Sequence, residues 1–199
     1  ELSHTDKIVG VISEPSNLFS KLAFLNTKVT DWLLPLIALI IVAIAATFIY
    51  MSNPEIKLEM QQQQEKAMRE QFQKMVESGQ MTQQQVDEQL DKTAEMMNNP
   101  MIIYLIPSIS IFVIMLLWFF IFTTIAFLIA KFAFKGDGSY SQAMTAMGLS
   151  MYISVLQSII LVIVGLLMGK MLTGLNPASL TGMDIKTLPG FLLSRLDVF

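Results

Sequence analysis

The sequence predicts an all-α membrane protein: a multi-span helical bundle with an N-terminal interfacial helix and an extramembrane helical hairpin. The chain of 199 residues is 53% hydrophobic and only 15% charged, whereas soluble domains carry about a quarter charged residues. Three windows contain no charged side chain at all, namely 32–54, 96–130 and 138–169. Each is long enough for a membrane-crossing helix of roughly 20 apolar residues. A soluble protein of this size would have little chain left to cover three such helices.

Residues 1–31 are expected to form a short lead followed by an amphipathic helix. Pro15 suits the first turn of this helix, where its missing N–H is not needed. Leu18, Phe19 and Leu22 then fall on one face, with polar residues opposite. Because the helix is too short to span and directly precedes a span, we expect it to lie in the headgroup layer.

The first two spans are predicted at 32–51 and 101–131. Trp32 and Tyr50 bracket the first one, as expected for amphipathic rings at the two membrane interfaces. At 1.5 Å per residue this span is about 27 Å long, close to the hydrocarbon thickness. The second is longer than a perpendicular helix requires, so we expect it to be tilted, kinked at Pro107 or extended beyond the bilayer.

A polar insert at 55–99 separates these two spans and is predicted to form a helical hairpin. Ser78 and Gly79 interrupt its helical pattern, and Thr82 with Gln85 forms a capping box at the start of the second helix. Each helix carries an apolar stripe. The candidate partner-binding residues are Met68, Phe72, Met75, Val76, Val86, Leu90 and Met97. The alternative is that the two stripes pack only against each other, or that the glutamine run is partly disordered.

The third span, predicted at 141–170, carries hydroxyl residues at every fourth position and a G-x-x-x-G motif. Residues four apart share one face of a helix, and small and polar residues favour close helix packing in membranes. The predicted packing face comprises Ser150, Ser154, Gln157, Ser158, Gly165 and Gly169. The alternative is a substrate path, but such a path usually contains an ionisable residue inside the membrane. None is expected within the three spans.

Residues 171–199 are predicted to form a mixed loop and an amphipathic segment that leads into a fourth span. Because the chain begins with Glu1 and stops at Phe199, we interpret it as a fragment of a longer protein. Two lysines in the tight loop at 131–142 favour a cytoplasmic N-terminus, since Lys and Arg are enriched in cytoplasmic loops. The GDGS sequence at 136–139 predicts a tight turn.

The residue types that indicate catalysis or metal binding are nearly absent. The chain has no cysteine and one histidine, so it lacks a zinc constellation and a Ser-His-Asp or Cys–His set. We therefore expect no catalytic residue, no metal and no cofactor, and we interpret His4 as a bystander. The net charge of −3 argues against a nucleic-acid partner, which requires a basic face.

Two segments share features with a known family. The first is IVGVISEPSNLFSKLAF, with Trp32 to Pro35 behind it, and the second is AKFAFKGDGSYSQAMTAMGLSMYISVLQSIILVIVGLLM at 130–168. Together they resemble the Yip domain family, the Ypt-interacting integral membrane proteins and their bacterial relatives. The resemblance covers about half of the chain. It implies about five spans and a cytoplasmic N-terminus.

The functional implications of this resemblance are limited. Eukaryotic members are scaffolds in vesicle traffic that engage Rab-type GTPases, but no residue of this chain matches a Rab site. The family often has a proline where residues 153–155 lie, so the third span is expected to be straighter here. The insert at 55–99 has no counterpart in the family.

Three functions remain open from the sequence. The leading hypothesis is a non-enzymatic scaffold or accessory subunit of a bacterial cytoplasmic membrane. Its partners would be membrane lipids and other membrane proteins or a second copy, with the hairpin as docking surface. The alternative is a small-molecule or lipid transporter or channel component that uses the polar face of the third span. A third is a membrane enzyme whose catalytic groups lie beyond Phe199.

Overall fold

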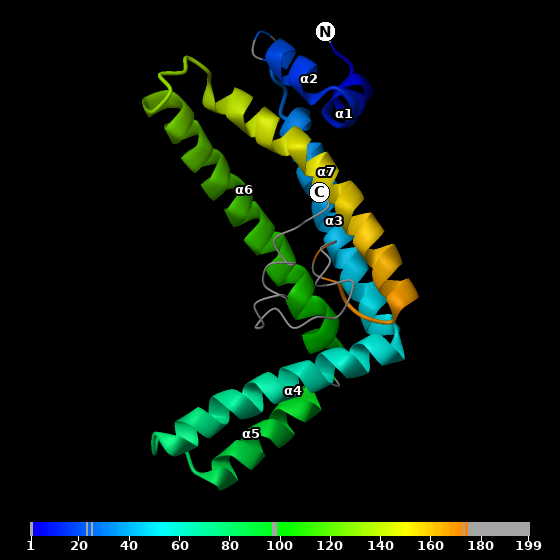
Figure 1. The fold of residues 1–199 in the computed structure, drawn as a ribbon, viewed down its shortest axis with the longest axis vertical. Coiled ribbons are helices and arrows are strands. Elements are labelled where there is room, and N and C mark those ends of the chain that lie inside the picture. The colour runs from blue at the N-terminus through cyan, green and yellow to red at the C-terminus, as the bar shows by residue number, and fades with distance from the viewer. Residues whose placement is uncertain (1, 23, 25, 97–98, 173, 175–199) are drawn as a thin grey trace, which may run out of the picture. The chain divides into compact units, whose positions relative to one another are not determined.

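The structure, a computed structural model, is helical throughout the part of the chain that it describes. It describes residues 2–22, 24, 26–96, 99–172 and 174. Seven α-helices and one π-helical turn follow one another along this part, without a strand (Figure 1). The predicted loop and amphipathic segment at 171–199 lie almost entirely outside the described residues.

Among the described residues, three helices are long and apolar enough to cross a membrane. They are α3 (Thr30–Ser52), the continuous helix Met101–Phe132 that includes α6 (Ile106–Phe132), and α7 (Tyr140–Met168). Their mean hydropathies are 2.7, 2.7 and 2.4. The predicted all-α membrane fold is therefore confirmed, and the spans predicted at 32–51, 101–131 and 141–170 fall on these helices.

The chain divides into two compact units, which are described separately below. Unit 1 comprises Glu1–Ala45 and Ser110–Ile160, and unit 2 comprises Ala46–Ile109 and Leu161–Phe199. Unit 1 holds the N-terminal helices, and unit 2 holds the polar hairpin.

Unit 1 begins with a helix that the sequence did not predict, α1 (His4–Ser13). Its start is a capping box: the Ser3 hydroxyl accepts the Asp6 N–H at 3.1 Å, and the Asp6 carboxylate accepts the Ser3 N–H at 3.0 Å. The Asp6 carboxylate also accepts the Ser3 hydroxyl proton at 2.7 Å, and this bond, together with the one from the Ser3 N–H, lowers the pKa of Asp6. A carboxyl group whose pKa is lower in the folded than in the unfolded protein stabilises the fold at any pH above its unfolded pKa. This stabilisation is lost only as the pH falls through the folded pKa, so the cap is complete at neutral pH.

The second helix, α2 (Pro15–Leu22), packs its apolar face against other helices of unit 1. Pro15 occupies its first position, as predicted. The apolar residues Leu18 and Leu22 are buried, and Phe19 packs beside them. They form one cluster with Val11 of α1 and Leu149 of α7. The predicted apolar face of α2 therefore packs against α1 and α7, and the placement of this helix at the membrane interface stays a prediction.

The core of unit 1 is built where α3, α6 and α7 meet. Trp32 stacks on Phe119 with ring centroids 5.5 Å apart. Leu36 and Ile40 of α3 complete the buried cluster with Phe119. On the other side of Trp32, a Cβ at Gly148 would collide with the Trp32 backbone, so only glycine allows α7 to approach α3 this closely.

Unit 2 contains the predicted helical hairpin, formed by α4 (Pro54–Glu77) and α5 (Gln83–Met96). The predicted capping box at α5 is present: the Gln85 N–H donates to the Thr82 hydroxyl at 3.3 Å, and the Thr82 N–H donates to the Gln85 side chain at 2.9 Å. Figure 1 shows α5 lying along α4.

The second span begins with a π-helical turn, Met101–Leu105, just before Pro107. The Ile106 N–H bonds to the Met101 carbonyl, five residues back. Proline has no N–H to donate, and its ring clashes with the carbonyl four residues earlier in a regular α-helix. A wider turn relieves this conflict, so the irregularity expected at Pro107 takes the form of a π-turn on its N-terminal side.

The turn between α6 and α7 starts one residue before the predicted GDGS segment. Lys135 has a φ of 53°, in the left-handed region, and the Gly136 N–H then bonds to the Ala130 carbonyl at 3.0 Å. Ser139 and Gln142 form a third capping box, at the start of α7. The reversal therefore places a lysine where glycine is the least strained residue.

Replacing Lys135 by Gly should raise the free energy of unfolding by about 1 kcal/mol, because a left-handed conformation costs an L-residue about 1–2 kcal/mol. Thermal or denaturant unfolding of the detergent-solubilised protein measures the change. Lys135→Ala is the matched control, since it removes the same charge and keeps the strain. Equal stabilisation by both substitutions would show that the backbone conformation is not the cause.

Candidate functional site

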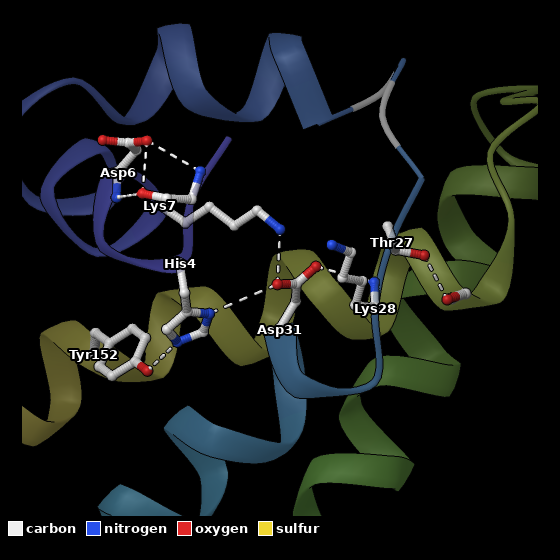
Figure 2. A network of polar contacts seen from close by, with 9 residues as sticks. His4, Asp6, Lys7, Thr27, Lys28, Asp31 and Tyr152 are labelled. Atoms are coloured by element: carbon white, nitrogen blue, oxygen red, sulfur yellow. Dashed lines mark hydrogen bonds and ion pairs between the residues drawn. The ribbon is translucent and has the colours of Figure 1, made fainter. Parts of the chain in front are cut away.

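A buried ion pair joins α1 to the first turn of α3 (Figure 2). The Lys7 Nζ lies 2.7 Å from the Asp31 Oδ1. The two side chains are only 6% and 2% exposed, which is rare for charged residues unless they are paired. This pair is the most deeply buried set of charges in the described part of the chain.

The second oxygen of Asp31 is also used. It accepts the Lys28 N–H at 3.0 Å, and the Asp31 N–H donates to the Lys28 carbonyl at 3.0 Å. A carboxylate in the first turn of a helix is further stabilised by the helix dipole. Asp31 therefore ties the segment before α3, the start of α3 and α1 together.

His4 lies beside this pair and extends the cluster to α7. Its Nε2 is 2.7 Å from the Tyr152 hydroxyl, and its Nδ1 is 3.7 Å from the Asp31 Oδ1. The second distance is too long for a hydrogen bond, and this nitrogen is buried without a hydrogen-bond partner. The interpretation of His4 as a bystander is therefore wrong in one respect: its side chain takes part in the contacts that connect α1 with α3 and α7.

The position of Asp31 explains why the sequence does not predict this cluster. The first charge-free window starts at Trp32, but α3 starts at Thr30, so Asp31 belongs to the first turn of this helix. Asp31 is thus an ionisable residue within the helix of the first span, although it lies outside the predicted bounds 32–51. The available signal was an acidic residue directly before the charge-free window that starts at Trp32.

The serine residues of the predicted packing face of α7 are only half-buried. Ser154, Gln157 and Ser158 are partly exposed, and the Ser150 hydroxyl donates to the Met147 carbonyl of its own helix at 2.7 Å. In unit 1 the buried face of α7 is formed instead by Thr145, Gly148 and Leu149.

The two glycines of the G-x-x-x-G motif in α7 have different roles. Gly165 is a close-approach position in unit 2, since an added Cβ would lie 2.6 Å from the Tyr50 hydroxyl oxygen. Gly169 follows the last residue of α7 and has a φ of 66°, and the Lys170 N–H returns to the Gly165 carbonyl. Gly169 is thus a helix terminator, which corrects its assignment to the packing face.

The candidate partner-binding stripe of the hairpin mostly faces inward. Val86 and Leu90 are buried, and the stripe residues of α4 are partly buried: Met68, Phe72, Met75 and Val76. Met97 lies outside the described residues. The alternative reading, in which the stripes pack against each other, accounts for these burials. The exposed apolar side chains of the hairpin are Leu58 and Met96.

The comparisons with known proteins add no relative. No protein-family model, no curated protein and no solved structure matches the chain. Within the described residues no group of three or more His, Asp or Glu side chains could hold a metal ion. What the structure defines is an all-α membrane protein whose N-terminal helices are held by a buried polar cluster.

Removing one charge of the Lys7–Asp31 pair should lower the free energy of unfolding by about 3 kcal/mol, because it leaves the other charge buried and unpaired. Asp31→Asn is suitable because an amide oxygen can still accept the Lys28 N–H. Combining it with Lys7→Met should recover part of the loss, with a coupling energy of about 1–3 kcal/mol. Denaturant unfolding in detergent gives all four free energies of the cycle.

The matched control is Arg69→Met, which breaks the exposed Arg69–Glu65 pair. Exposed pairs of this spacing on a helix contribute about 0.3–0.5 kcal/mol. If Asp31→Asn costs no more than Arg69→Met, or if the two changes at the buried pair are simply additive, the pair does not anchor α1.

Proposed function

We propose that this protein is a non-enzymatic integral membrane scaffold or accessory subunit that binds other membrane proteins. The observation that supports this most is the α4–α5 hairpin, in which Val86 and Leu90 are buried while most of the polar side chains are exposed. A hairpin that packs on itself can stand outside the bilayer without lipid. It then offers a rigid polar surface, with Leu58 and Met96 as its exposed apolar groups.

A bacterial cytoplasmic membrane with a cytoplasmic N-terminus is part of the proposal. The Thr27 hydroxyl lies 2.6 Å from the Ser141 hydroxyl, so the segment before α3 and the start of α7 are at the same end of unit 1. This end carries five lysines: Lys7, Lys21, Lys28, Lys131 and Lys135. Two of them, Lys131 and Lys135, lie at the short turn between α6 and α7, and this density of lysine in a short loop favours the cytoplasmic side. Membership of the Yip domain family, inferred from the segments quoted above, agrees with this orientation.

The distribution of charge in the spans favours a scaffold over a transporter. The charged side chains of the three spans are Asp31 and Lys131, which lie in the first turn of α3 and the last turn of α6. Proton and substrate paths usually need ionisable groups deeper in the membrane. The polar line around Gln157 contains none, so packing between helices is its simpler role.

Deleting residues 57–97 should abolish a specific protein contact, because it removes the proposed docking arm and retains the buried Ile56. Crosslinking in native membranes, followed by mass spectrometry of the products, measures the loss. The full-length chain should yield a reproducible crosslinked partner that is absent from the deletion variant.

Two point variants test whether the crosslink requires the folded hairpin or only the presence of its residues. Leu90→Asp places a charge in the buried seam and should also remove the crosslink, whereas Gln84→Asp on the exposed surface of the same helix should keep it. If neither the deletion nor Leu90→Asp changes any crosslink, the hairpin is not a docking surface.

A further inference from the structure

An open groove in unit 1 lies between α2, the end of α6, the turn after it and the start of α7. Its volume is about 450 Å³, within the range of about 300–1,000 Å³ that is typical of ligand sites. The residues that matter for the argument are Phe19, Ala126, Phe127, Ala130, Lys131 and Ala143. The surface of the groove is mainly apolar.

Small residues from two helices create the space. Ala126 and Ala130 are four residues apart and therefore lie on one face of α6, and Ala143 faces the same groove from α7. Phe19 of α2 and Phe127 of α6 also line it. The groove is therefore lined by alanine and phenylalanine side chains. Its shape and its apolar surface suit a hydrocarbon chain.

The groove has one charged lining residue, and its charge is positive. Lys131 is the only charged residue among the lining residues, and its Nζ lies 5.3 Å from the centroid of the Phe127 ring. Ser139 and Gln142 also line the groove, but they bond to each other in the capping box of α7. The nearest acidic residue in sequence, Asp137 in the turn, is not part of the lining.

The position of Lys131 in the last turn of α6 sets the depth of the groove in the membrane. Because this helix is a span, its final turn lies at the level of the headgroups, where lysine side chains reach toward water. Ala130 adjoins Lys131 in this turn, and Ala126 lies five residues, or about 7.5 Å, farther along the helix toward the acyl-chain region. The groove therefore has its cation at headgroup depth and its apolar part in the hydrocarbon.

We propose that this groove binds one anionic phospholipid, with its phosphate at Lys131 and an acyl chain along Ala126 and Ala130. The occupant is a whole lipid and not free phosphate, because most of the groove can contact only hydrocarbon. The site does not depend on the scaffold function. If the N-terminus is cytoplasmic, it faces the leaflet in which anionic lipids attract basic residues.

The test is native mass spectrometry of the detergent-solubilised full chain, titrated with phosphatidylglycerol. One phosphatidylglycerol should bind per chain, and phosphatidylcholine should bind more weakly. Lys131→Gln should raise the dissociation constant about fivefold, the equivalent of about 1 kcal/mol per basic residue at a lipid headgroup. Lys135→Gln is the matched control: it removes a neighbouring charge outside the groove and should leave binding unchanged.

A second pair of variants tests the apolar part. Ala130→Leu fills the groove without changing charge and should reduce phosphatidylglycerol binding, whereas Ala133→Leu, at an exposed position outside the lining, should not. Equal losses for Lys131→Gln and Lys135→Gln would mean general surface attraction and would overturn the proposal. So would an absence of stoichiometric lipid, or inorganic phosphate that competes fully with the lipid.

Discussion

The buried ion pair between Lys7 and Asp31 is the contact on which the arrangement of the N-terminal helices depends. Each charge would cost several kcal/mol to bury alone, so the two side chains are tolerated only when α1 lies over the start of α3. Once α1 is there, Val11 can cover the apolar face of α2 together with Leu149 of α7. Two helices as short as α1 and α2 could not stay folded alone. The ion pair therefore attaches them to the membrane bundle.

Two consecutive residues connect this cluster to the spans. Asp31 binds α1, whereas Trp32 stacks on Phe119 of α6 and touches α7 at Gly148. The close approach at Gly148 also brings α7 near α1, where Tyr152 meets His4. The same end of unit 1 carries the groove with Lys131. In the proposed scaffold, this end of unit 1 would bind the lipid, and the self-packed hairpin would bind the protein partner.

The features that follow from local pattern could be predicted, and those that need distant partners could not. Apolar runs located the spans, and Thr82 with Gln85 located the second helix of the hairpin. The Lys7–Asp31 pair joins residues far apart in sequence, so no periodicity reveals it. Gly169 shows a different limit, since glycine serves both close packing and helix termination, and only its φ of 66° separates the two roles. Apolar stripes likewise do not reveal whether they face a partner or each other.

Hydrogen exchange of the α1 amides in detergent or nanodiscs tests most directly whether the buried pair holds the N-terminal helices to the spans. In Asp31→Asn, exchange in α1 should accelerate by about a hundredfold, the equivalent of about 3 kcal/mol of local stability. Exchange in the α4–α5 hairpin should be unchanged. Equal protection of α1 in both proteins would contradict the account, because α1 would then be held by something other than this ion pair.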